Sequence, residues 1–109
     1  MKTTTDYLDS VKLKLGLPSD YALAKYWAVS KQHISEYRNG KRTLGDERAL
    51  EVARILGINP VEVFIAIQCQ RAKSDQVKQV WGEFMEKISM GFKDFISHGN
   101  PRRRYFSAR

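Results

Sequence analysis

The chain has 109 residues, enough for one domain or for a small domain with an appendage, and its 42% hydrophobic and 28% charged residues suit a globular core with a solvated surface. No apolar run reaches the roughly 20 residues that a membrane span needs, and the N-terminus lacks the apolar stretch of a signal peptide. The formal net charge of +7 points toward a polyanionic partner.

The first of five short helices predicted in residues 1–72 begins near Thr5, a residue type that commonly caps helices. Leu8 and Val11 recur on one face of this helix, which is therefore expected to be buried. Gly16 ends the helix, because glycine readily adopts the left-handed conformation found at helix C-termini.

The second and third helices are predicted on either side of a short turn. Ser19 is placed to cap the second helix and Ser30 the third, which ends near Gly40. Ile34 and Tyr37 share the inner face of the third helix at helical spacing. The opposite face of that helix is left to polar and charged side chains.

The fourth and fifth helices have start signals of their own. Thr43 and Asp46 are spaced as a capping box before the fourth helix, and Gly57 follows its end. Asn59 and Pro60 are a cap and a first-turn proline for the fifth helix. Together the five helices predict a compact all-α unit.

A longer amphipathic helix is predicted over residues 75–98, followed by a basic tail that contains Arg102, Arg103 and Arg104. We therefore divide the chain into a helical domain (1–72) and a C-terminal helix with its tail (73–109). Apolar side chains form one wide stripe along the long helix: Val77, Val80, Trp81, Phe84, Met85, Ile88, Phe92, Phe95 and Ile96.

The second and third helices carry a combination of residues that resembles a known DNA-binding motif. The combination comprises Ala24, Ala28, Val29, Ser30, Ile34, Ser35, Tyr37, Asn39 and Gly40. It resembles the helix-turn-helix of the Cro and lambda-repressor-like (XRE) family of phage and bacterial regulators, and the resemblance covers roughly residues 6–70. The resemblance implies a five-helix domain that inserts its third helix into DNA.

Two residues depart from the pattern of that family. The turn position usually occupied by glycine is Ala28, and the first position of the second helix, often a phosphate-contacting glutamine, is Asp20. An acidic side chain suits the start of a helix but repels phosphate. We therefore do not expect Asp20 to contact DNA.

The third helix offers side chains suited to the major groove, within a stretch (31–42) that carries four basic residues and one acidic residue. Gln32 can pair with adenine, Lys31 can donate to guanine, and Glu36 can accept from cytosine. These three fall where base readers lie in the motif that the chain resembles. Phosphate contacts are expected from Ser30, Ser35, Asn39, Lys41 and Arg42.

A single helix-turn-helix reads too few base pairs to select one site in a genome, so such proteins commonly bind pseudo-palindromes as dimers. The long helix is the best candidate for holding two copies together. Its expected dimerisation residues are Trp81, Phe84, Ile88, Phe92 and Phe95. The three arginines of the tail are expected to add affinity for any DNA without selecting a sequence.

The sequence therefore predicts a homodimeric, sequence-specific regulator of transcription, most simply a phage or bacterial repressor, acting in the cytoplasm on a pseudo-palindromic operator in double-stranded DNA. An antitoxin-like module whose C-terminal helix binds another protein is the alternative. No catalytic constellation, metal-ligand spacing, cofactor motif or room for a small-molecule domain is found. Cys69 is the single cysteine, which suits a reduced, intracellular protein.

Overall fold

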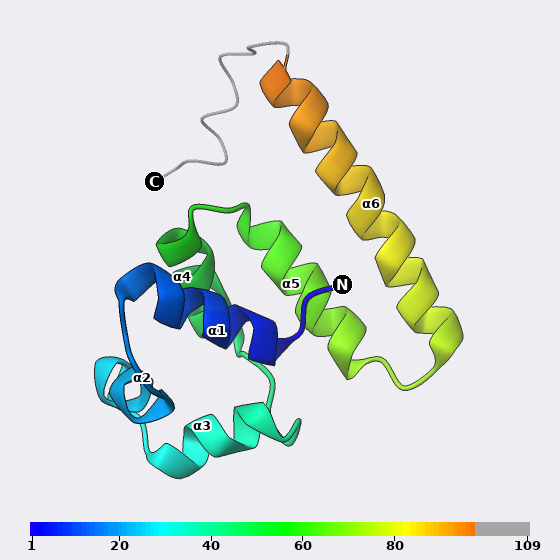
Figure 1. The fold of residues 1–109 in the computed structure, drawn as a ribbon. Coiled ribbons are helices and arrows are strands. Elements are labelled where there is room, and N and C mark those ends of the chain that lie inside the picture. The colour runs from blue at the N-terminus through cyan, green and yellow to red at the C-terminus, as the bar shows by residue number, and fades with distance from the viewer. Residues whose placement is uncertain (98–109) are drawn as a thin grey trace.

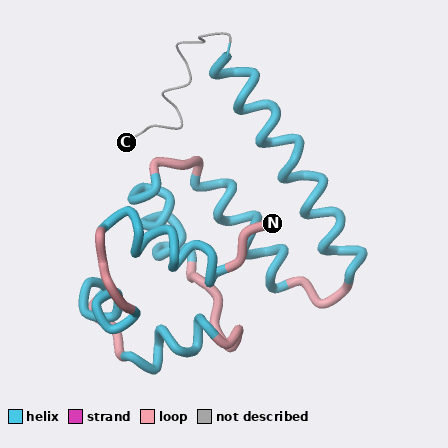
Figure 2. Tube along the Cα trace, viewed as in Figure 1, coloured by secondary structure: helices cyan, strands magenta, loops and turns pink. Residues whose placement is uncertain are grey.

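The described part of the chain is built from six helices and contains no strand (Figures 1 and 2). The computed structural model describes residues 1–97, and the side chains of residues 1–90. The elements are α1 (Thr4–Leu15), α2 (Asp20–Trp27), α3 (Lys31–Arg38), α4 (Asp46–Leu56), α5 (Pro60–Arg71) and α6 (Asp75–Ser97). The predicted all-α fold, five short helices followed by a long one, is confirmed.

The start of α1 differs from the prediction, because Thr3 rather than Thr5 is its N-cap. Thr3 N donates to Asp6 Oδ2 at 2.8 Å, and Asp6 N donates to Thr3 Oγ1 at 3.4 Å. This reciprocal capping box needs an acidic residue three positions after the cap, which Thr3 has and Thr5 lacks. The helix ends as predicted at Gly16, which is left-handed with φ 69°.

The predicted caps of α2 and α3 are confirmed. Ser19 Oγ accepts a hydrogen bond from Ala22 N at 3.0 Å, and Ser30 Oγ accepts one from His33 N at 3.1 Å. Each bond satisfies a backbone donor that the first turn of a helix leaves without an intrahelical partner. The two serines therefore fix where the paired helices begin.

The turn between α2 and α3 passes through Ala28 in the left-handed conformation, with φ 56° and ψ 44°. Ala28 is the one non-glycine residue with positive φ among the residues that the structure describes. Alanine in this conformation costs about 1 kcal/mol relative to glycine. Val29 N closes the end of α2 by donating to Ala24 O at 2.9 Å, and the Ala24 side chain is buried where the two helices meet.

The predicted capping box at the start of α4 is wrong. Gly45 is the N-cap and provides no side-chain hydrogen bond. The Thr43 hydroxyl instead accepts a hydrogen bond from Arg71 Nε of α5 at 2.8 Å. Leu44 is buried in the core within a non-helical segment, and α4 begins only at Asp46. A long-range contact has therefore replaced the local cap.

One hydrophobic core is shared by the first five helices. The fully buried side chains include at least one from each: Leu8 and Val11 from α1, Leu23 from α2, Ile34 from α3, Val52 from α4 and Val63 from α5. The predicted inner faces of α1 and α3 are therefore confirmed. Since α3 contributes Ile34 and Tyr37 to this core, its outer face is held in a fixed direction.

The two ends of the five-helix unit are joined by one side chain. Gln70 Oε1 near the end of α5 accepts hydrogen bonds from Thr4 N at 2.8 Å and from Thr4 Oγ1 at 2.9 Å. Thr4 is completely buried, so these bonds satisfy polar groups that water does not reach. The start of α1 and the end of α5 are thereby fixed together.

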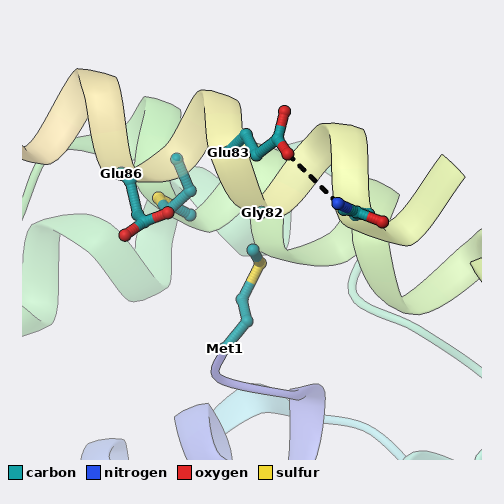
Figure 3. A pocket seen from close by; sticks show the side chains of 6 residues that line it. Met1, Gly82, Glu83 and Glu86 are labelled. Carbon is teal, nitrogen blue, oxygen red and sulfur yellow. Dashed lines mark hydrogen bonds between the residues drawn. The ribbon is translucent and has the colours of Figure 1, made fainter. Parts of the chain in front are cut away.

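Helix α6 runs back along α5 after a short connection (Figure 1). Met85 lies on the side that faces the unit and packs against the core. Figure 3 shows Met1 reaching from the N-terminal segment toward α6 beside Gly82, and these two residues line a shallow hollow together with Glu83 and Glu86. No described helix combines the length and the apolar character that crossing a membrane requires.

Candidate nucleic-acid interface

The outer face of α3 is a row of exposed polar side chains backed by two buried ones. Ile34 and Tyr37 are 1% and 3% exposed, whereas Lys31, Gln32 and Ser35 are exposed. Asn39, which ends the helix, is exposed as well. The structure thus brings together on one surface most of the residues that were predicted from the sequence to contact DNA.

The carboxylate of Glu36 lies within this row and is held by its neighbours. Arg42 donates to Glu36 Oε1 from Nε at 2.9 Å and from Nη2 at 2.7 Å. Gln32 Nε2 donates to Glu36 Oε2 at 3.4 Å. The hydrogen bonds from Arg42 are the main reason that the pKa of Glu36 is lowered from its usual value.

Arg42 reaches Glu36 because the chain turns back over the end of α3. The backbone N–H groups of Lys41 and Arg42 both donate to Glu36 O, at 3.0 and 3.2 Å. Asn39 Oδ1 accepts from Lys41 N at 3.1 Å and fixes the same turn. The two basic side chains therefore project from the C-terminal end of α3 and are both exposed.

At the other end of α3, Lys31 lies over the ring of Tyr21 from α2. The ammonium nitrogens of Lys31 and Lys25 are 5.5 and 5.3 Å from the centre of this ring, which is the range of cation–π contacts. Tyr21 is 55% exposed, and it lines a groove of about 250 Å³ between the two helices together with Asp20, Ile34 and other residues of α3. Tyr21 and Lys25 were not among the predicted site residues, although their spacing of four residues places them on one face of α2.

Asp20 is engaged in ion pairs on the inner side of this groove. Arg38 donates to it from Nη2 at 2.8 Å and from Nε at 3.1 Å, and Lys12 Nζ lies 3.0 Å from the same carboxylate. Arg38 also pairs with Asp9 at 2.8 Å. These pairs link α1, α2 and α3, and they agree with the expectation that Asp20 does not face phosphate.

The Asp20 ion pairs predict a loss of stability in acid. The hydrogen bond from Arg38 is the main cause that lowers the pKa of Asp20 below its ordinary 3.8. Because the folded pKa is the lower one, this stabilisation is complete above the unfolded pKa and is lost as the pH falls toward the folded pKa. Denaturant unfolding between about pH 6 and about pH 2 should show a shallower fall in unfolding free energy for Asp20→Asn than for the unmodified chain. Parallel curves would contradict this assignment.

His33, on the flank of α3, is engaged with the core side of the helix. Its Nε2 lies 3.1 Å from Tyr37 Oη, and the two rings meet edge to face. Burial is the main cause that lowers the pKa of His33, with a further contribution from the positive charge of Arg42. The imidazole is therefore neutral at physiological pH and adds no charge to this surface.

Helix α6 presents a second surface, which consists of Val77, Val80 and Phe84 and is called here the exposed flank of α6. These three side chains are 45%, 63% and 47% exposed. Of the predicted dimerisation residues, Phe84 belongs to this flank, and Trp81 and Ile88 are partly buried at its border. The side chains of Phe92 and Phe95, and residues Arg102, Arg103 and Arg104, lie outside the part that is described.

Comparison with protein families gives a match to a model described as helix-turn-helix over residues 13–63. The matched segment contains the whole of α2, α3 and α4 together with the end of α1 and the start of α5. Comparisons with curated proteins and with solved structures gave no match. The match agrees with the capped helix pair, the left-handed turn and the exposed face of α3. The match over residues 13–63 thus supports the resemblance of this segment to the helix-turn-helix of Cro and lambda-repressor-like DNA-binding proteins.

Proposed function

We propose that the protein is a sequence-specific regulator of transcription, a repressor of phage or bacterial type that acts in the cytoplasm on double-stranded DNA. The main support for this proposal is the outer face of α3. Polar side chains are exposed on this face, and the opposite face of the helix is anchored in the core. A helix of this kind fits the B-DNA major groove, in which each base pair shows a distinct donor and acceptor pattern.

Base readout is assigned to the N-terminal half of α3. Gln32 can pair with N6 and N7 of adenine, and Lys31 can donate to O6 and N7 of guanine. Glu36 is retained as a base reader for cytosine N4, although Arg42 and Gln32 already occupy most of the accepting sites of its carboxylate. Both Lys31 and Gln32 are exposed in the free protein.

Phosphate contacts are assigned to the two ends of the same helix. Lys41 and Arg42 supply cationic donors, and Ser35 a hydroxyl. The Ser30 hydroxyl can still donate while it accepts the capping bond, and Asn39 keeps its amide N–H groups free of the turn that its oxygen closes. Such contacts position the helix without reading sequence.

We propose further that two copies pair through α6. The exposed flank of α6 is apolar, and residues 75–98 carry a net charge of only −1, so electrostatic repulsion between two copies is small. Burying apolar surface contributes roughly 25 cal/mol per Å² before the entropy cost of association. A dimer would present two α3 helices to a pseudo-palindrome whose half-sites lie about 34 Å apart.

The proposal is tested by selecting binding sites from a randomised duplex library and then comparing two variants. Gln32→Ala should weaken binding to the selected site by about 1–3 kcal/mol and change binding to unrelated DNA little, because the lost contact is to a base edge. Lys41→Ala should weaken binding to all DNA alike and lower the salt dependence by about one ion, because the lost contact is to a phosphate. A wild-type chain that enriches no sequence would contradict the proposal.

A further inference from the structure

Two side chains of α3 and one from the turn that follows it form a linear series of hydrogen bonds, in which Arg42 binds Glu36 and Glu36 binds Gln32. We propose that Glu36 and Arg42 are positioning residues that fix the orientation of the Gln32 amide and thereby determine which base pair Gln32 selects. The inference rests on the proposed function, because it assigns the source of specificity at the same DNA-binding surface.

The orientation of Gln32 follows from the chemistry of its partner. An ionised carboxylate only accepts hydrogen bonds, so the NH₂ group of the Gln32 amide, and not its oxygen, must face Glu36. The amide keeps its oxygen and one N–H for another partner. The amide oxygen and the amide N–H are thus held in a fixed order along the helix. They match the N6 donor and the N7 acceptor of adenine in only one of the two orientations of an adenine–thymine base pair. A fixed order therefore favours A·T over T·A as well as over G·C.

Glu36 is in turn fixed by Arg42. The guanidinium places two N–H groups, at 2.9 and 2.7 Å, on the same carboxylate oxygen, and this leaves the other oxygen for Gln32. A planar fork of this kind holds a carboxylate in a way that the single ammonium of lysine does not. The lowered pKa of Glu36 agrees with a carboxylate that stays ionised and accepting.

Arg42 also connects this series to the DNA backbone. Its side chain is 46% exposed, and three of its five N–H donors remain after the two bonds to Glu36. A phosphate bound by the remaining donors would hold the guanidinium in place, and so the amide of Gln32. Glu36 then mainly connects the phosphate contact of Arg42 to the base contact of Gln32, rather than binding cytosine itself.

The decisive variant is Arg42→Lys, because it keeps the positive charge and removes the fork. Binding of full-length protein is measured to the duplex selected by the wild type and to the three substitutions at the base pair where Gln32→Ala loses its preference. We expect Arg42→Lys to lower the preference at that pair by about three- to tenfold, since Gln32 must then be ordered on binding, and to keep the wild-type salt dependence. Lys41→Ala, the matched control, should leave the preference unchanged.

Two further measurements separate positioning from direct contact. In a Gln32→Ala background, Arg42→Lys should change the preference at that pair no further, because its effect passes through Gln32. In the free protein, NMR titration should show that Arg42→Ala raises the pKa of Glu36. A preference that Arg42→Lys leaves intact, or a pKa of Glu36 that Arg42→Ala leaves unchanged, would overturn the inference. A wild-type protein that selects no site would instead overturn the proposed function.

Discussion

A chain carrying Val80→Lys and Phe84→Lys is expected to sediment as a monomer and to bind its selected DNA site at least roughly a hundredfold more weakly than the wild type. Both side chains belong to the exposed flank of α6, where they are 63% and 47% exposed. Two lysines on each copy would place like charges in the interface and remove its apolar contact. Each monomer would then bind DNA through a single α3 helix, without the gain in affinity that a linked second binding site provides.

Lysine is the informative substitution, because added positive charge by itself strengthens binding to DNA. Weaker binding by this variant therefore cannot come from electrostatics. Met90→Lys is the matched control, since Met90 is 70% exposed on α6 and lies outside the exposed flank. Analytical ultracentrifugation and a binding titration on the same samples provide the measurement. A wild-type chain that is monomeric at high concentration and on DNA would refute the dimer and mean that the apolar stripe of α6 packs on its own domain.

Ile34→Ala should lower the free energy of unfolding by about 2–5 kcal/mol. Ile34 is 1% exposed and is the main aliphatic anchor between α3 and the core. Loss of its buried atoms leaves a cavity that the neighbouring helices can fill only in part. Because domains of this size are stabilised by only about 5–15 kcal/mol in total, the effect is large, and thermal unfolding should occur well below the wild-type temperature.

Ser35→Ala is the matched control for this change. Ser35 follows directly on the same helix but is exposed, so its loss should change stability by less than about 0.5 kcal/mol. Urea unfolding monitored by circular dichroism gives both values, provided that the slope with denaturant is unchanged. Equal stability of the two variants would mean that α3 is not anchored through Ile34.

Local sequence signals predicted the helices and their buried faces well. Ser19 and Ser30 were identified as N-caps because serine directly before an apolar helical pattern commonly caps the helix, and both form the expected hydrogen bonds. Ile34 and Tyr37 were placed in the core from helical spacing alone, and both are buried. Such features depend on residues within one turn of each other, which the sequence contains directly.

Contacts between distant residues were the ones that the sequence could not specify. Thr43 has the spacing of a cap, but its hydroxyl binds Arg71, which lies 28 positions further along the chain. Arg42 lies beyond the end of α3, and only the folded turn shows that it reaches Glu36. The local sequence pattern does not show which hydrogen-bond partner such a side chain will take, because these bonds form only after the helices have packed.

The stripe on α6 shows a different limit. Its apolar positions were predicted from their spacing, yet they cover a wider arc than one neighbouring helix can bury. Packing on α5 uses the side that carries Met85 and leaves Val77 and Val80 exposed. The spacing alone could not divide the stripe between these two surfaces, because every apolar position satisfies the same periodicity.

The hydrogen bonds from Thr4 to Gln70 make the five-helix unit nearly a closed ring of chain. Polypeptide enters and leaves it at neighbouring points, so a host protein could accept the whole unit within a surface loop without having to span a gap. The same closeness suits circular permutation, in which a short linker joins the old ends and new ones are opened in a surface turn. The unit is thus physically suited to being moved between proteins as a single cassette.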